Sequence, residues 1–324
     1  MKIDFNKYID GDITKKEALE LFNLKGNDLL YLFATADKIR NKYCGNILET
    51  CTITNAKSGK CSEDCKFCAQ SAWYNTDIKS YPIKDKETLK KEFYEAEKNK
   101  SMRFGIVTAG KKMKYGTSEF NTVLEFIKEI TSENPNTRIC CSLGLLGEKE
   151  LFELKKAGAS RYHCNIQTSP DTYSLYAAAT HSFKERIETI KNAQKAGLEI
   201  CSGGIIGMGE SFEDRINMAF TLKELDVDGI PINILNPIKN TPHGEKEILS
   251  AVEILKTIAV FRLILKDKNI KIAAGRENIF KDFMGAGYLA GANGMLVGGY
   301  LTVKGRAIED DFKFIKNIQK IWKR

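Results

Sequence analysis

Short apolar runs alternate with longer amphipathic stretches along most of the chain. Eight of the runs have the length and composition of buried β-strands, and they lie at 47–54, 102–109, 137–143, 161–166, 199–207, 229–235, 270–274 and 294–298. The segments between them carry apolar residues at helical spacing, as from Phe120 to Ile130, and several end at a glycine such as Gly158. This alternation predicts a parallel (β/α)8 barrel of the TIM type, with an open doubly wound sheet as the alternative.

The first 45 residues follow a different pattern, in which helices occur without strands between them. Thr14 and Glu17 have the spacing of a capping box ahead of an apolar stretch. A second helix is predicted from Asn27 to the residue before Gly45, and a final helix over 310–324. We therefore expect an N-terminal helical extension over residues 1–45 and a barrel domain with its C-terminal helix over 46–324.

Charge and hydropathy argue against nucleic acid and membranes as binding partners. The 324 residues carry a formal net charge of +8, but the lysines are mixed with glutamates, as in 84–92. This mixing favours a solvated surface over nucleic-acid binding. The N-terminus has no signal-peptide pattern, and the most apolar helical stretch, 254–265, is too short to span a membrane. We expect a cytoplasmic protein without a membrane partner.

Three of the nine cysteines lie within eight residues, in the segment Cys61-Ser-Glu-Asp-Cys65-Lys-Phe-Cys68. Three thiolates on one loop can hold a [4Fe-4S] cluster and leave one iron for a small molecule. Structural zinc is the alternative, although zinc sites usually close with four protein ligands and no second Cys-x-x-Cys follows. Because this loop directly follows the first predicted strand, it should lie at the catalytic end of a barrel.

Other thiols occur on predicted strands. These are Cys51, Cys164, Cys201 and the pair Cys140 and Cys141, of which alternation allows only one to enter the barrel. Each one alone is typical of a small buried hydrophobic residue. Thiols on four strands favour a second metal site, whereas a salt bridge is the usual role for an arginine placed like Arg276, after the seventh strand.

Polar and glycine residues at other strand ends suit a flat, zwitterionic ligand. Asn165, Gln167, Arg186 and Asn233 could pair with its carboxylate and hydroxyl groups, with surface exposure as the alternative. The segment 201–210 is rich in glycine, which allows a ligand close to the backbone, but its spacing is not that of a dinucleotide fingerprint.

Four segments together resemble the biotin synthase family of radical S-adenosylmethionine (SAM) enzymes. They are Cys61-Ser-Glu-Asp-Cys-Lys-Phe-Cys-Ala-Gln-Ser71, Cys201-Ser-Gly-Gly-Ile-Ile-Gly-Met-Gly-Glu210, Pro231-Ile-Asn-Ile-Leu-Asn-Pro-Ile-Lys-Asn-Thr-Pro242 and Ala273-Ala-Gly-Arg-Glu277. The resemblance implies a [4Fe-4S] cluster on Cys61, Cys65 and Cys68, with SAM on the open iron. Reductive cleavage of SAM would give a 5′-deoxyadenosyl radical, and two such cycles would insert one sulfur into dethiobiotin.

The resemblance also assigns residues to the cofactor and the substrate. Arg186 is expected to meet the SAM carboxylate, and Gln167 stands where the family usually has an aspartate on the ribose. Asn165 would touch SAM or dethiobiotin, and Asn233 would face dethiobiotin. The cofactor pocket is expected to include further residues, namely Phe67, Thr108, Gly203, Ile205 and Gly207.

The auxiliary cluster is where this sequence departs from the family. Known members hold a [2Fe-2S] cluster with three barrel cysteines and an arginine, and the resemblance matches Cys140, Cys201 and Arg276 to three of these positions. The fourth is Gly105 here. We hypothesise that Cys51 replaces the missing thiol, with Cys164 as the second choice, in a cluster that is [2Fe-2S] or larger.

The expected function is sulfur insertion by a biotin synthase. A related radical SAM enzyme, of the hydrogenase-maturase or methylornithine-synthase kind, is the first alternative, and a non-enzymatic iron–sulfur carrier is the second. The resemblance further implies a homodimer and a flavodoxin or ferredoxin as electron donor.

Overall fold

The computed structural model describes residues 3–302 and 305–323. Its strands are β1 (Glu49–Lys57), β2 (Arg103–Thr108), β3 (Ile139–Ser142), β4 (Arg161–His163), β5 (Glu199–Cys201), β6 (Gly204–Ile206), β7 (Gly229–Ile234), β8 (Asn269–Ile272) and β9 (Gly294–Leu296). Its α-helices are α1 (Lys7–Asp10), α2 (Lys15–Leu21), α3 (Gly26–Cys44), α4 (Lys86–Lys98), α5 (Ser118–Glu133), α6 (Glu148–Ala157), α7 (Tyr173–Tyr176), α8 (Phe183–Lys195), α9 (Phe212–Glu224), α10 (Ala251–Ile264), α11 (Met284–Leu289) and α12 (Ile308–Trp322). A π-helical turn, η1 (Arg276–Phe280), and a 3₁₀ turn, η2 (Lys281–Phe283), follow β8.

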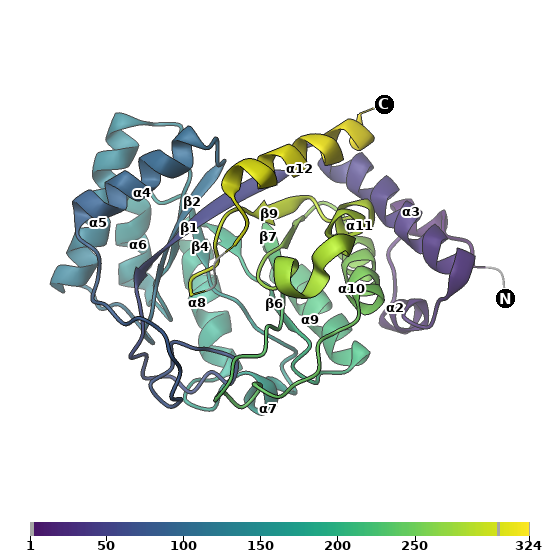
Figure 1. The fold of residues 1–324 in the computed structure, drawn as a ribbon, viewed down its shortest axis with the longest axis horizontal. Coiled ribbons are helices and arrows are strands. Elements are labelled where there is room, and N and C mark those ends of the chain that lie inside the picture. The colour runs from purple at the N-terminus through teal and green to yellow at the C-terminus, as the bar shows by residue number, and fades with distance from the viewer. Residues whose placement is uncertain (1–2, 303–304, 324) are drawn as a thin grey trace.

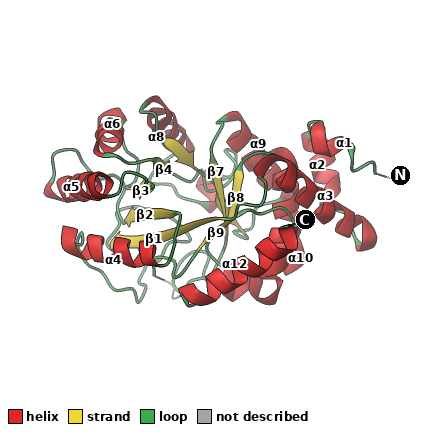
Figure 2. Ribbon diagram, turned by 90° about the horizontal axis from the view of Figure 1, so that it is seen from above, coloured by secondary structure: helices red, strands yellow, loops and turns green. Residues whose placement is uncertain are grey.

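The strands form one closed parallel barrel. Their order is β5-β4-β3-β2-β1-β9-β8-β7-β6, and β7 also pairs with β5 through Cys201 and Gly229. β5 and β6 are two parts of one strand that is interrupted at 202–203. Counted in this way, the barrel has eight strands. Figure 2 shows the helices arranged around the strands. The predicted (β/α)8 fold is confirmed.

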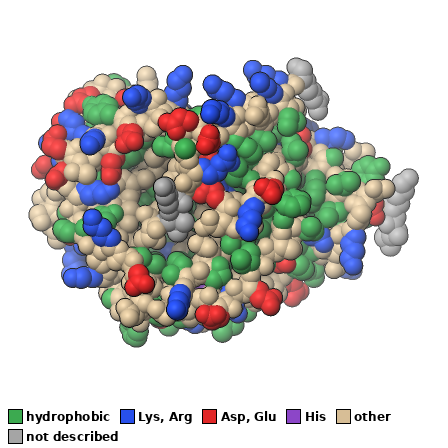
Figure 3. All heavy atoms as spheres, in the orientation of Figure 1, with side chains coloured by type: hydrophobic (Ala, Val, Ile, Leu, Met, Phe, Trp, Pro, Cys, Tyr) green, Lys and Arg blue, Asp and Glu red, His purple; other side chains and the backbone are tan. Residues whose placement is uncertain are grey.

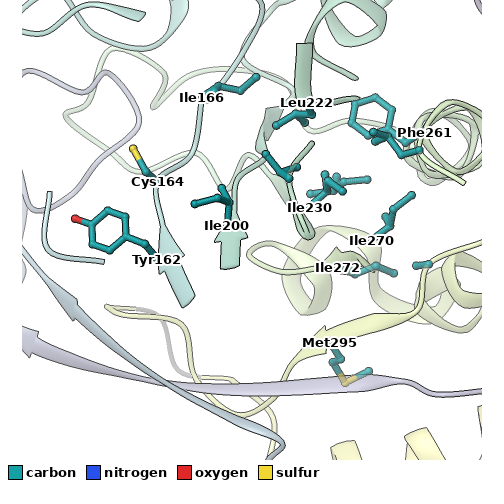
Figure 4. Close-up of a cluster of buried hydrophobic side chains, with 14 of the residues drawn as sticks. Tyr162, Cys164, Ile166, Ile200, Leu222, Ile230, Phe261, Ile270, Ile272 and Met295 are labelled. Carbon is teal, nitrogen blue, oxygen red and sulfur yellow. The ribbon is translucent and has the colours of Figure 1, made fainter. Parts of the chain in front are cut away.

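The core lies between the strands and the surrounding helices. Alternate residues of each strand face these helices, as Ile270 and Ile272 of β8 do in Figure 4, where they lie in the same cluster as Phe261 of α10. The residues between them, such as Lys271, therefore point into the barrel. The capping box at Thr14 and Glu17 is present at the start of α2, as predicted.

Helices from the two ends of the chain meet on the outside of the barrel. Figure 1 shows α2 and α3 beside α9 and α10, and α12 reaching back toward α3. The guanidinium carbon of Arg40 lies 3.8 Å from the centre of the Trp322 ring, which joins α3 to α12. The final helix occupies 308–322 rather than 310–324; Arg324 lies outside the described residues. The division of the chain at residue 45 stays a prediction.

The surface carries mixed charges. Figure 3 shows acidic and basic side chains interspersed over the visible face, together with apolar groups. In the part of the chain that the structure describes, no helix is long and apolar enough to cross a membrane.

The packing of α3 gives a stability prediction. Leu32 is fully buried in the main core, whereas Leu30 on the same helix is 63% exposed. Leu32→Ala should lower the free energy of unfolding by about 2–5 kcal/mol because it leaves a cavity. Leu30→Ala, the matched control, should change it by less than about 0.5 kcal/mol. Urea unfolding followed by circular dichroism measures both, and equal effects would contradict this packing.

Candidate active site

A cavity of about 280 Å³ occupies the barrel interior and reaches the carboxyl ends of the strands. Most of the residues predicted for the site line it: Cys51, Cys61, Cys65, Phe67, Cys68, Thr108, Cys140, Asn165, Gln167, Arg186, Cys201 and Asn233. A neighbouring cavity of about 160 Å³ shares Phe67, Asn165 and Asn233 with it and adds Ile205 and Arg276 to the lining. The closed barrel therefore gathers residues that are far apart in the sequence.

The loop that carries Cys61, Cys65 and Cys68 is folded by its own backbone. The Cys68 amide donates to the Cys65 carbonyl at 3.0 Å, and the Cys61 amide donates to the Gln70 carbonyl at 2.9 Å. Burial raises the pKa of Cys65 to about 12 and that of Cys68 to about 11, so bound cations are needed to hold these groups as thiolates.

The arrangement of these thiols bears on the choice between zinc and a cluster. Among residues 3–302 and 305–323, no three His, Cys, Asp or Glu side chains converge on one metal-ion position. A structural zinc ion usually takes four protein ligands, whereas three thiolates can each bind a different iron of a cubane cluster. The three thiols and the adjoining cavity fit a [4Fe-4S] cluster with one iron open to a ligand.

The same loop is tied to the segment before α8. The Asp64 carboxylate accepts hydrogen bonds from the Ala179 and Thr180 amides, each at 3.0 Å. Arg186 lies in the first turn of α8, which begins with a capping box at Ser182 and Glu185. These contacts fix the position of the cluster loop relative to Arg186.

Arg186 presents a cation beside two of the loop thiols. It lines a third cavity, of about 140 Å³, together with Cys61, Cys65 and Asn165. Burial alone would lower the pKa of Arg186, but Tyr173 and Cys164 raise it, and the guanidinium remains charged. A fixed cation next to an open iron suits a ligand carboxylate.

Amide side chains line the main cavity together with the cluster loop. Gln167 has a φ of 72°, uncommon for a non-glycine residue, and its buried Oε1 has no hydrogen-bond partner among the described residues. Asn165 Oδ1 accepts from the Gly203 amide at 3.0 Å. Asn233 donates to the Gly204 carbonyl at 3.1 Å and accepts from the Ala274 amide at 3.2 Å. Of these three amides, Gln167 thus has the buried oxygen that remains available to a ligand.

The predicted glycines act through the backbone. A Cβ on Gly203 would lie 2.1 Å from the Pro231 carbonyl oxygen, so no larger residue fits where β5 gives way to β6. Gly207 has a φ of 99° and donates its amide to Glu210 at 2.8 Å. Neither glycine lines any of the cavities at this site. Both instead set the path of the backbone that surrounds the site.

Deeper in the barrel, Cys51, Cys140 and Cys201 approach one another. Burial raises the pKa of Cys140 to about 12, and the nearby Cys51 and Cys201 thiols add to that rise. Lys271 Nζ lies 2.7 Å from Cys51 Sγ. Burial alone would lower the pKa of Lys271, but Cys51 and Cys201 raise it above its ordinary value. Three thiols and one ammonium group therefore share the barrel interior.

The remaining strand thiols lie elsewhere. Cys141 packs into the main hydrophobic core, as strand alternation requires when Cys140 faces inward. Cys164 lines the cavity beside Arg186 instead of the cavity that contains Cys51, and Figure 4 shows it close to Tyr162. Of the two predicted substitutes for the missing thiol, the structure brings Cys51 alone to Cys140 and Cys201.

Buried charges form the floor beneath these thiols. Glu49 accepts from Arg103 Nε and from Arg161 Nη1, both at 2.9 Å, and lies 3.5 Å from Lys271 Nζ. Burial would raise the pKa of Glu49, but these three cations lower it to about 2. Arg103 Nη1 is buried without a partner among the described residues. Glu199 also pairs with Arg103 and Arg161, at 2.7 and 2.8 Å, so three cations face two carboxylates. The remaining positive charge fits an anionic iron–sulfur cluster held by the three thiolates.

Comparisons with known proteins agree with this geometry. Residues 56–222 match the family model of the Radical SAM superfamily, and residues 231–319 match the Biotin and Thiamin Synthesis associated domain. A biotin synthase from Carboxydothermus hydrogenoformans is 46% identical over 313 residues, which cover 96% of each chain. The chain belongs to the biotin synthase family. A biotin synthase from Clostridium tetani is 47% identical over 322 residues, covering 98% of this chain and 97% of that protein.

Solved structures support the fold. Methylornithine synthase (PylB) matches with a TM-score of 0.82 at 20% identity, covering 97% of this chain and 95% of that one. HydG, a maturase of the [FeFe]-hydrogenase, matches with a TM-score of 0.81 at 17% identity and covers 97% of this chain and 73% of that one. At these identities the likeness concerns architecture alone. For a biotin synthase relative, the family implies SAM and a [4Fe-4S] cluster, and an auxiliary cluster is typical.

Within this member of the biotin synthase family, Gly105 has a steric explanation. It pairs with Ile53 across β1 and β2, and a Cβ on Gly105 would lie 2.9 Å from Ile53 Cγ2. The isoleucine side chain thus takes the space that a cysteine at position 105 would need.

The structure does not bring Arg276 to the thiols. Its two terminal nitrogens donate to Asp311 at 3.0 and 2.7 Å, and it also pairs with Glu277 at 2.7 Å. The basic residue beside the thiols is Lys271, which the sequence-based assignment missed. Strand alternation was the available signal, because Lys271 is charged and lies between Ile270 and Ile272.

The placement of Arg276 gives a prediction. Arg276→Met would remove the two close cationic contacts of the fully buried Asp311 carboxylate and leave it only Arg306 at 3.9 Å, which should lower the free energy of unfolding by about 3–5 kcal/mol. The folded protein should still take up the same amount of iron. Denaturant unfolding and iron analysis of the folded fraction measure the two effects. A loss of iron at unchanged stability would return Arg276 to the ligand set.

Proposed function

We propose that this chain is a biotin synthase, which converts dethiobiotin to biotin by radical SAM sulfur insertion. The observation that carries the proposal is the position of the Cys61, Cys65 and Cys68 loop, at the mouth of a closed barrel whose interior holds three further thiols. The relatives named biotin synthase support it over nearly the whole chain.

Each part of the wall has a task in this proposal. Cys61, Cys65 and Cys68 hold the [4Fe-4S] cluster, which, with SAM bound and one electron supplied, provides a 5′-deoxyadenosyl radical. Arg186 binds the SAM carboxylate, and the unpartnered Gln167 Oε1 accepts a hydrogen bond from a ribose hydroxyl. The surrounding strands keep water from the reacting carbons.

The second cavity is the proposed place for dethiobiotin. It adjoins the main cavity and is lined by Asn233, Ile205 and Phe67, which combine apolar contact with an amide. Asn165 lines both cavities and can face SAM on one side and the substrate on the other. A substrate held there lies beside Cys68 of the cluster loop, and the adjoining main cavity contains the deeper thiols.

The deeper thiols are the proposed source of sulfur. Cys51, Cys140 and Cys201 hold the auxiliary cluster, and Lys271, with Arg103 below it, balances its charge. Lys271 takes the role that the resemblance implies for Arg276. Two further features rest on the resemblance alone: a homodimer and a flavodoxin or ferredoxin donor. The cytoplasmic location stays a prediction from the sequence.

Product analysis tests the proposed reaction. Anaerobically reconstituted protein, incubated with reductant, SAM and dethiobiotin, should form biotin and 5′-deoxyadenosine, both detected by mass spectrometry. Cys65→Ser should reduce both products to background because the catalytic cluster loses a ligand. Reductive SAM cleavage without any organic product would instead favour the iron–sulfur carrier.

Cys51→Ser tests the auxiliary site. The variant should lose iron and acid-labile sulfide down to the content of one [4Fe-4S] cluster, because the three-thiol set is broken. Cys141→Ser is the matched control on the outward face of β3 and should keep the full content, since Cys141 packs in the core. Unchanged auxiliary iron in Cys51→Ser would remove Cys51 from the site.

A further inference from the structure

A line of hydrogen bonds connects the cluster loop to Arg186 through His181. Glu63 lies between Cys61 and Cys65, and its Oε2 is 2.9 Å from His181 Nδ1. On the other side of the ring, His181 Nε2 is 2.7 Å from Arg186 Nη2. Glu63 and His181 are 6% and 5% exposed, so water has little access to either contact. The cluster loop and the guanidinium thus share one buried imidazole.

The chemistry of the partners fixes the state of that imidazole. A guanidinium has donors and no acceptor, so His181 Nε2 must accept from Arg186 and carry no proton. Nδ1 then holds the proton and donates it to the Glu63 carboxylate. Burial, and next the positive charge of Arg186, lower the pKa of His181, which agrees with a neutral ring.

The contacts of Arg186 are shared among three elements. Nε donates to the Tyr173 hydroxyl, Nη1 donates to the Asn165 carbonyl at 2.8 Å, and Nη2 donates to His181. A guanidinium has five N–H groups, so each terminal nitrogen keeps a second one. A carboxylate can accept both in a bidentate pair if the plane of the guanidinium is held still.

We propose that His181 is a positioning residue, which holds Arg186 Nη2 in place so that the guanidinium meets the SAM carboxylate beside the open iron. The proposal rests on the proposed function, because it takes Arg186 as the carboxylate-binding residue. Through Glu63, the same ring ties the guanidinium to the loop of Cys61 and Cys65. The cluster and the carboxylate site therefore keep a fixed separation.

Equilibrium binding of SAM to the reconstituted protein tests the proposal without any turnover. His181→Leu removes both ring contacts and should weaken SAM binding by about 10–100-fold, the usual effect of losing an orienting partner. Iron and sulfide content should stay at the wild-type level. His181→Gln can place an amide near the position of Nε2 to accept from Arg186, and it should recover most of the affinity.

His243→Leu is the matched control. His243 is 4% exposed, its Nε2 contacts the Tyr176 carbonyl at 2.7 Å, and its amide donates to the Lys66 carbonyl in the same loop. In the described part of the chain, no hydrogen bond joins it to Arg186. It should bind SAM within about threefold of the wild type, well short of the loss expected for an orienting partner. Equal losses in both Leu variants, or no recovery in His181→Gln, would overturn the proposal and leave His181 a packing residue.

Steady-state kinetics separate this inference from the proposed function. If biotin forms, His181→Leu should raise KM for SAM far more than it lowers kcat, because ground-state binding is what the ring supports. A fall in kcat at constant KM would contradict it. If no biotin forms while SAM binding still depends on His181 as described, the assigned substrate is wrong and the positioning role stands.

Discussion

The alternation of side chains along the strands of a closed parallel barrel is the constraint on which the site depends. On β8 it sends Ile270 and Ile272 outward to the helices and Lys271 inward, and on β3 it separates Cys141 from Cys140. Closure through Cys201 and Gly229 then turns inward-facing positions on distant strands into neighbours. Because all the strands are parallel, their carboxyl ends lie at the same end of the barrel, where the cluster loop also lies.

Charge placed inside this barrel has a large desolvation cost and must be compensated locally. Glu49 pairs with two arginines and a lysine, and Glu199 pairs with the same two arginines, yet the three cations still outnumber the two carboxylates in contact with them. An interior of this kind is stable when thiolates bound to iron supply the missing negative charge. The floor of the barrel therefore contributes to the fold and to cofactor binding through the same contacts.

The sequence predicted the barrel and the cluster loop because both depend on local signals: hydrophobic period, chain order and the spacing of three cysteines. It could not foresee that Arg276 pairs with Asp311 while Lys271, five positions earlier, lies beside the thiols, because both placements depend on strand register and on a carboxylate distant in the sequence. The role of Ile53 at Gly105 and the contact between His181 and Arg186 depend on tertiary packing. No periodicity in the chain encodes them.

The pairing of Ile53 with Gly105 has a consequence for how ligand sets can interchange. A cysteine introduced at 105 alone would be forced against a branched side chain, and trimming Ile53 alone would leave a void beside a glycine. Each single step is unfavourable, whereas both together restore complementary volumes. A ligand set with a cysteine at 105 and the present set with Gly105 are thus related by steric epistasis. Changing from one to the other requires substitutions at 53 and 105 together.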